Sequence, residues 1–236
     1  MRYIEFIKVK KIIIVFISLF FIFSCAEDED INLEKNDFLF EFETSTEGWV
    51  YGFADYPVGE ENFYELSFEH TSLPKPLDTS IKALKQSGNN HSDDLFMFIK
   101  RKFTNLKPNH KYQIEFDIEI ASNASDNSVG VGGSPGSSVS IKAGASLIEP
   151  NKVVVENLYR MNIDKSNQNQ SGKDMVVIGD FSNGLDEFIY NLKSLKSDTF
   201  SITTDEKGEF WLIIGTDSGF EATTTIYYNS ISIKLK

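Results

Sequence analysis

Polar side chains suited to binding hydroxyl groups are concentrated in three segments of the chain. These segments run from Ser87 to Asp94, from Asn162 to Gly172 and from Gly215 to Glu221. Asn, Gln and Asp side chains present fixed hydrogen-bond donors and acceptors, which match the hydroxyl groups of a sugar. We expect a binding site if the three segments meet at one end of the fold, and separate loops if they lie apart. The candidate ligand-binding residues in them are Asn89, Asn90, Asp94, Asn167, Gln168 and Asp217.

Aromatic rings are a second set of candidates, because their faces can stack on the C–H surfaces of a sugar. Tyr56 and Tyr64 lie in a region interrupted by prolines, and we expect them to be exposed platforms. Trp49, Tyr51 and Trp211 are further candidates. For the two tryptophans, packing in the core is the competing interpretation, since large aromatic residues are more often buried than displayed.

Acid–base catalysis is an alternative that the sequence leaves open. Glu115, Asp117 and Glu119 alternate along one predicted strand, so successive Cα atoms lie about 6.5–7 Å apart. This spacing overlaps the carboxyl separations of glycosidases, roughly 5–9.5 Å. A polysaccharide lyase would instead use His91 as a base beside Arg101. The candidate catalytic residues, if the protein is an enzyme, are therefore His91, Arg101 and Glu115. A solvated strand face is the better interpretation of the carboxylates, and a hydrogen-bonded turn before a charged strand is the competing interpretation of His91 and Arg101.

Other catalytic and metal-binding motifs fail in their context. Gly132-Gly133-Ser134-Pro135-Gly136 matches the G-x-S-x-G pattern, but a nucleophile elbow requires a histidine later in the chain. All three histidines precede Ser134, and the sequence contains one cysteine, so a zinc site is not expected either. A glycine-rich loop is the better interpretation of this stretch.

The charge of the chain argues against nucleic-acid partners. The sequence has 23 basic and 35 acidic residues, a net charge of −12. Without residues 1–24, which hold four basic residues and Glu5, 19 basic and 34 acidic residues remain, a net charge of −15. Such a surface repels phosphate backbones, and contact with a membrane through basic side chains is not expected.

Period-two alternation predicts an all-β protein. The strictest example is 112–120, where Tyr112, Ile114, Phe116, Ile118 and Ile120 share one face. Short strands separated by Gly, Asn and Asp turns predict a sandwich or barrel with no helix. A hairpin is expected between 199–204 and 209–215, and a bulge is expected near Asn229-Ser230 in the last strand. The other expected strands are 38–43, 81–86, 95–103, 139–143, 152–156 and 175–180.

The N-terminus has the form of a secretory signal peptide. Basic residues precede an apolar run, 12–23, which is shorter than the roughly 20 residues that span a membrane. The only cysteine, Cys25, follows this run directly. We therefore expect a signal peptide at 1–24, an acidic tether at 25–36 and one β-sandwich domain at 37–236.

Ile22-Phe23-Ser24-Cys25 resembles a bacterial lipobox, in which the cysteine carries the lipid. The acidic run Glu27-Asp28-Glu29-Asp30 is similar to the surface-export signal of Bacteroidota lipoproteins. This resemblance implies a protein anchored in the outer membrane by lipid on Cys25, at the cell surface, with no other membrane contact. No thiol would then remain for a disulfide or for catalysis.

Three further pieces resemble a jelly-roll carbohydrate-binding module of the galactose-binding-like type. They are the strand 40–43 with Gly48-Trp49, the segment 106–114 with its Leu-x-Pro and Tyr, and a closing hairpin formed by 210–212 and 231–233. The resemblance implies two antiparallel sheets and non-catalytic binding of a glycan. It also implies a structural Ca²⁺, for which the nearest matches are Glu41, Glu43 and Asn229. A structural or adhesive subunit of an outer-membrane assembly is the remaining alternative.

Overall fold

The computed structural model describes residues 37–236, and every regular element among them is a β-strand. The prediction of an all-β fold without helices is therefore confirmed for this part of the chain. The predicted signal peptide, Cys25 and the acidic tether lie outside the described residues. Within 37–236 there is no helix of the length and apolar character needed to cross a membrane.

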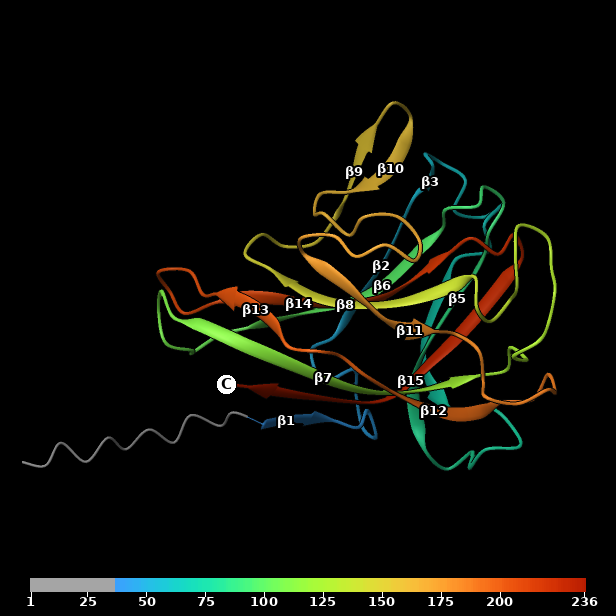
Figure 1. The fold of residues 1–236 in the computed structure, drawn as a ribbon, viewed down its shortest axis with the longest axis horizontal. Helices are drawn as coiled ribbons and strands as arrows, with labels where there is room; N and C mark the ends of the chain where they lie inside the picture. Colours follow the sequence, from blue (N-terminus) through green and yellow to red (C-terminus); the bar gives the residue numbers. More distant parts are fainter. Residues whose placement is uncertain (1–36) are drawn as a thin grey trace, which may run out of the picture. The chain divides into compact units, whose positions relative to one another are not determined.

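The first of two large sheets has seven strands, all paired antiparallel (Figure 1). Its central strand β15 pairs with β7 on one side, and with β5 and β1 one after the other on the opposite side. The strands are β12 (Asn191–Lys196), β13 (Phe200–Thr203), β7 (Lys111–Ser122), β15 (Thr223–Leu235), β1 (Asp37–Phe40), β5 (Lys82–Asn89) and β4 (Ser67–Ser72).

The second large sheet has five antiparallel strands in the order β11-β8-β14-β6-β2. It packs against the first sheet, so the predicted jelly-roll sandwich of two antiparallel sheets is confirmed. Because β14 lies at its centre, both edges of β14 are hydrogen-bonded to neighbours. The strands are β11 (Met175–Asp180), β8 (Val139–Ser146), β14 (Phe210–Ser218), β6 (Phe96–Phe103) and β2 (Val50–Ala54).

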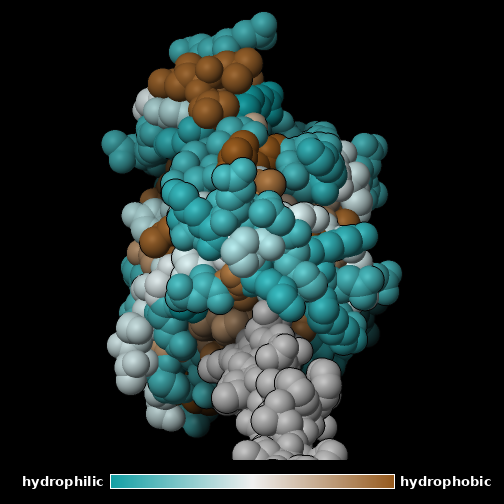
Figure 2. All heavy atoms as spheres, turned by 90° about the vertical axis from the view of Figure 1, so that its left-hand side faces the viewer, coloured by the Kyte–Doolittle hydropathy of each residue, from teal (hydrophilic) through white to brown (hydrophobic). Residues whose placement is uncertain are grey.

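A small third sheet projects at the top of Figure 1. It consists of β3 (Tyr56–Pro57), β10 (Leu158–Met161) and β9 (Lys152–Val155), with β9 as its outer strand. Figure 2 shows a hydrophobic patch near the top of the molecule, at the height where Figure 1 places the β9–β10 hairpin.

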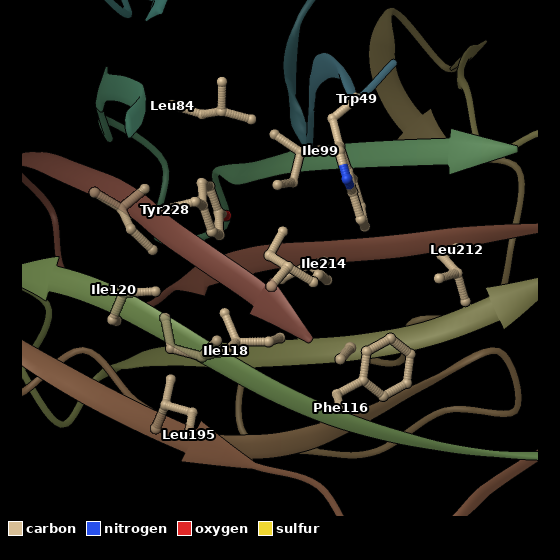
Figure 3. Close-up of a cluster of buried hydrophobic side chains, with 14 of the residues drawn as sticks. Trp49, Leu84, Ile99, Phe116, Ile118, Ile120, Leu195, Leu212, Ile214 and Tyr228 are labelled. Atoms are coloured by element: carbon tan, nitrogen blue, oxygen red, sulfur yellow. The ribbon is translucent and has the colours of Figure 1, made fainter. Parts of the chain in front are cut away.

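The core lies between the two large sheets and is built from alternate residues of their strands (Figure 3). Ile118 and Ile120 of β7 face Leu212 and Ile214 of β14, and all four are fully buried. Trp49 is also in this core, with 1% of its surface exposed, as the packing interpretation predicted. Burial of such side chains stabilises the fold by about 1.5–3 kcal/mol each.

Several strand predictions are confirmed, and one pairing is wrong. The last strand does carry an irregularity, because its register with β7 shifts between Tyr228 and Ser230. The expected hairpin of β13 with β14 does not form, since β13 pairs with β7 in the first sheet. The reason is that β6 and β8 occupy both edges of β14. The prediction of a closing hairpin between 210–212 and 231–233 is also wrong, because β14 and β15 belong to different sheets.

The proline-interrupted region 52–80 is more ordered than the sequence predicts. It contributes most of β2 together with β3 and β4, and Pro57 itself lies in β3. Strand β10 was also not predicted, because Leu158–Met161 is short and its sequence does not alternate strictly between apolar and polar residues. Short strands of this kind follow from the position of a neighbouring strand, which local sequence does not encode.

Candidate functional site

The three polar segments meet at one end of the sandwich. Asn90, directly after β5, donates hydrogen bonds from Nδ2 to the backbone oxygens of Ser218, at 2.9 Å, and Phe220, at 3.0 Å. Its Oδ1 accepts the backbone N–H groups of Ser92 and Leu95, at 3.1 and 3.4 Å. Asn90 thus fixes the shape of its own turn and joins the first polar segment to the third.

The middle segment contacts both of the others. Gln168 donates from Nε2 to the backbone oxygen of Asp93, at 3.0 Å. Lys165 places its Nζ 2.8 Å from Oδ2 of Asp217. The sequence alone leaves open whether these segments form one site. The contacts of Asn90, Gln168 and Lys165 show that the segments lie together.

A pocket of about 350 Å³ opens where the segments meet. Its wall combines charged groups with a small apolar surface from Met161 and Ile163. A volume of this size fits the lower end of the range for small-ligand sites, about 300–1,000 Å³. The polar lining residues are Asp55, Asp94, Arg160, Asp164, Lys165, Ser166 and Asn167.

A chain of alternating charges forms the base of this pocket. Lys142 and Lys165 both contact Oδ2 of Asp217, at 2.7 and 2.8 Å. Lys165 also lies 2.9 Å from Oδ2 of Asp55. The side chains of Lys142 and Asp217 are fully buried, so this pair is shielded from solvent.

The charge chain continues to the pocket surface through Arg160. Its NH1 group is 3.1 Å from Oδ1 of Asp55 and 2.5 Å from Oδ2 of Asp94. Three cations therefore alternate with three carboxylates, and the network as a whole is neutral. Buried charges are tolerated when they are paired in this way.

Burial and neighbouring charges shift the pKa values of this network in different directions. Burial lowers the pKa of Lys142, against the opposing effect of Asp217. Burial also acts to lower the pKa of Lys165, but Asp217 and Asp55 together raise it above its ordinary value. For Asp94, burial is the main cause of a raised pKa, and Arg160 opposes it only in part.

Besides Oδ2 of Asp55, which lies 2.9 Å from Lys165, two carboxylate oxygens of the network are buried and accept no hydrogen bond from the described residues. They are Oδ1 of Asp94 and Oδ1 of Asp217. Buried polar atoms are normally satisfied by protein or by ordered water, so these two acceptors are exceptions. Asp94 lines the pocket with 24% of its side chain exposed, although its Oδ1 atom is itself buried.

Strand alternation explains why charges collect here. Lys142 of β8 and Asp217 of β14 sit on the face of their sheet that points away from the core, while Ile141 and Ile214 sit on the core face. The loop between β10 and β11 covers this outer face and supplies Lys165. The loop is braced by Asp164, whose carboxylate accepts the backbone N–H groups of Ser166 and Lys173 at 3.0 Å each.

The predicted polar residues fall into three roles. Asp94 and Asn167 line the pocket, and Asp217 lies beneath it against the two lysines. Gln168 and Asn90 hold the loops together through the bonds described above. Asn89 closes β5 opposite Thr223 of β15 and does not line the pocket.

The prediction that Tyr56 and Tyr64 are exposed platforms is wrong. Only 1% of Tyr56 and 2% of Tyr64 is exposed, because the two rings pack 5.5 Å apart and Tyr56 also packs 5.0 Å from Tyr159 of β10. Burial, reinforced by Glu61, raises the pKa of the Tyr56 hydroxyl. The exposed aromatic residue in this region is Phe63, which is 57% exposed and stacks on His91 at 4.0 Å between ring centres.

The three residues matched to a structural Ca²⁺ are not joined by any contact. Glu41 and Glu43 are exposed, and the Asn229 amide donates to Oε1 of Glu119 at 2.6 Å. Among residues 37–236 there is no group of three or more His, Cys, Asp or Glu side chains arranged to hold a metal ion. Calcium binding at these positions stays a prediction.

The three candidate catalytic residues bind different partners in different places. The Nε2 atom of His91 lies 3.1 Å from the backbone oxygen of Phe63. The Arg101 guanidinium lies over the ring of Phe40 at 4.3 Å, and Glu115 pairs with Lys236. Arg101 and Glu115 belong to different large sheets, so the expectation that the three act together is corrected.

Four residues of the charge network were not predicted, namely Asp55, Lys142, Arg160 and Lys165. Lys142 carried a usable signal, because it interrupts an otherwise apolar, buried strand and so requires a buried partner. Asp55, Arg160 and Lys165 carried none, since each lies in a loop or short strand whose position depends on the third sheet.

The chain was also compared with known proteins. No protein-family model and no curated protein sequence matches it. Among solved structures, it is similar to the CBM22-1 xylan-binding domain of Xyn10C from Paenibacillus barcinonensis, with 10% identity, a TM-score of 0.37 and coverage of 84% of this chain and 92% of that one.

Two other solved structures are similar at the same level. The mannan-recognising carbohydrate-binding module TmCBM27 has 13% identity and a TM-score of 0.38, over 84% of this chain and 95% of the module. The K1 cleaved adhesin domain of Lys-gingipain from Porphyromonas gingivalis W83 has 9% identity and a TM-score of 0.38, over 84% of this chain and 97% of the domain. Likeness at this level carries no information about the ligand of this protein.

Proposed function

We propose that the protein is a lipid-anchored cell-surface protein that binds a neutral glycan, without catalysis, in the pocket described above. The observation that carries this proposal is the meeting of three polar segments around one open pocket with fixed donors and acceptors. Preorganised polar groups are what a sugar site needs, because a flexible site would lose entropy on binding.

The pocket offers both donors and acceptors to hydroxyl groups. Arg160 is held by Asp55 and Asp94 through one terminal nitrogen, NH1. Asn167 adds an exposed amide, and the partly exposed carboxylate of Asp94 adds an acceptor. A sugar hydroxyl can donate to Asp94 while it accepts from Arg160, which is the pattern that paired carboxylate and guanidinium groups support.

The charge balance of the site favours a neutral ligand. Arg160 and Lys165 are compensated by Asp55, Asp94 and Asp217, so no cation is left unpaired to attract a carboxylate or sulfate. The net charge of the whole chain, −12, further disfavours polyanions. We therefore expect neutral polysaccharides to bind and uronate-rich ones to be excluded.

The stacked pair of Phe63 and His91 supplies an apolar surface beside the polar pocket. His91 lies three residues before Asp94 in the same turn, and the two rings are 21° from parallel. The exposed face of Phe63 can stack on the C–H side of a sugar ring.

Affinity gel electrophoresis of the full chain tests this function. We expect retardation in gels that contain soluble neutral xylan, mannan, galactan or glucan, and none in gels with polygalacturonate. Asn167→Ala should weaken binding about five-fold, since one hydrogen bond contributes about 1 kcal/mol. Asn169→Ala, in the same loop but outside the pocket, is the matched control. If the protein migrates equally far in a plain gel and in each gel that contains a neutral polysaccharide, the proposal is rejected.

The lipid anchor is a separate part of the proposal, since Cys25 lies outside the described residues. It rests on the apolar run, the cysteine and the acidic residues that follow. Cells that express the parent chain and are fed a labelled fatty acid should incorporate label into it, and Cys25→Ser should abolish incorporation. A labelled Cys25→Ser chain would contradict the anchor and leave the glycan site untouched.

A further inference from the structure

The outer edge of the third sheet is hydrophobic on both of its faces. Val153, Val154 and Val155 of β9 are 40%, 63% and 48% exposed, although valine favours burial. Within residues 37–236, β9 pairs only with β10, which leaves its other edge open. An apolar strand with an open edge is a template for pairing with another strand.

The hairpin turn determines which backbone groups face this open edge. Glu156 and Asn157 both have positive φ, 50° and 64°, as in a two-residue type I′ turn. Such a turn is closed by a hydrogen-bonded pair, here Val155 with Leu158. Because hydrogen-bonded and non-hydrogen-bonded pairs alternate, the N–H and C=O groups of Val154 point away from β10, into the open edge.

We propose that this edge binds the same edge of a second copy of the chain, antiparallel and with Val154 opposite Val154 of the second copy. The strand is complementary to itself in this register. Val153 then lies opposite Val155, and Lys152 at the start of β9 lies next to the turn residue Glu156 of the other copy, so opposite charges approach each other at both ends. Two third sheets join into one continuous sheet about a two-fold axis, the commonest symmetry of protein dimers.

The charges near β9 favour a second copy of the chain over an anionic membrane as the partner of this edge. An anionic membrane surface is excluded, because the chain is strongly acidic and only one basic residue, Lys152, lies on β9. Lys152 already donates to the Tyr56 hydroxyl at 2.5 Å and contacts Glu61 at 3.4 Å, yet 37% of its side chain is exposed, so a second carboxylate can approach. The hairpin projects from the sandwich in Figure 1, which leaves room for a partner along β9.

Cysteine cross-linking tests the register directly. Opposed residues of a hydrogen-bonded antiparallel pair have Cα atoms about 5.5 Å apart, within the range for a disulfide. Val154→Cys in the full chain should therefore form a covalent dimer under mild oxidation. Val153→Cys is the matched control, because its two copies lie roughly 8 Å apart in this register, too far for a disulfide. The parent chain, whose only cysteine is Cys25, shows how much covalent dimer forms through that residue.

We expect at least five-fold more dimer from Val154→Cys than from Val153→Cys or from Val129→Cys, whose residue is 94% exposed in a different loop. Equal cross-linking of all three variants would overturn the proposal. A second test is sedimentation equilibrium of the full chain in detergent. Glu156→Lys should weaken association at least five-fold, and Lys152→Glu combined with Glu156→Lys should restore it. A monomeric parent chain, or no restoration, would also overturn it.

Discussion

The two faces of the five-stranded sheet are built from alternate residues of the same strands, yet they are stabilised in different ways. In β14, Leu212 and Ile214 face the core and pack against apolar side chains of the opposite sheet. Asp217 faces the other way and contacts two buried lysines. The core face therefore depends on burial of apolar area alone, whereas the outer face combines a smaller apolar cluster, which includes Ile213 and Phe98, with charge pairing.

Apolar packing and ion pairing differ in how strictly they fix the positions of the side chains. Apolar packing is non-directional and tolerates replacement by residues of similar shape. A buried ion pair is satisfied only in one geometry, and it fixes the loops that reach it. On the outer face the ion pairs add to a smaller apolar cluster, and they position Arg160 and Asp94 at the pocket.

The largest expected effect comes from breaking the charge pairing. Asp217→Ala should lower the free energy of unfolding by about 3–5 kcal/mol, because it leaves Lys142 and Lys165 buried without their shared partner. Urea unfolding followed by tryptophan fluorescence measures this change. The matched control is Asp180→Ala, whose partly exposed pair with Lys193 should contribute no more than about 1 kcal/mol.

Equal losses for Asp217→Ala and Asp180→Ala would contradict the distinction between the two faces. Such a result would mean that water reaches Asp217 and screens its charge. The comparison would then reduce to one between a packed face and a solvated face.

A smaller effect is expected on the core face. Ile214→Val removes one methylene group from a fully buried side chain and should cost about 0.5–1.5 kcal/mol in the same urea experiment. Ile202→Val, at a partly buried position of β13, provides a comparison with less burial and should cost less. A larger loss for Ile202→Val than for Ile214→Val would show that burial does not rank these positions.

The smallest effect concerns the pH dependence of stability. The pKa of Asp94 is raised in the folded state, mainly by burial, so the folded protein binds more protons than the unfolded chain above pH of about 4. The contribution of Asp94 to stability is therefore lost as pH rises through this window. Asp94→Asn lacks this pH-dependent contribution, because the amide side chain does not titrate.

Urea unfolding of both chains between pH 4 and pH 7 measures the difference. The stability of Asp94→Asn relative to the parent should increase as the pH rises. A relative decrease would mean that Arg160 outweighs burial and lowers the pKa of Asp94.

The sequence carried most of the information about the core and part of the information about the site. Strict alternation in 112–120 predicts β7, and the change of phase near Asn229 predicts the bulge of β15. These features are local, so a single strand reveals them. The pairing of β13 could not be predicted, because it depends on which edges of β14 are already occupied.

For the site, the sequence identified segments better than individual residues. The polar composition of the three segments predicted that they could meet, and Asp94 and Asn167 do line the pocket. The burial of Tyr56 and Tyr64 was not predictable, because β10 and its loop, which cover them, carry no clear pattern. Arg160 and Lys165 were missed for the same reason, since their roles depend on contacts across the third sheet.

Hydrogen–deuterium exchange of the full chain with and without a retained neutral oligosaccharide tests the central claim most directly. We expect backbone amides in 90–95 and 160–170, which surround the pocket, to exchange more slowly when the oligosaccharide is bound. No change is expected in 104–110 and 205–208, which are loops away from the pocket that contact each other through Leu106 and Gly208. Protection of those loops, with none at the pocket, would contradict the account.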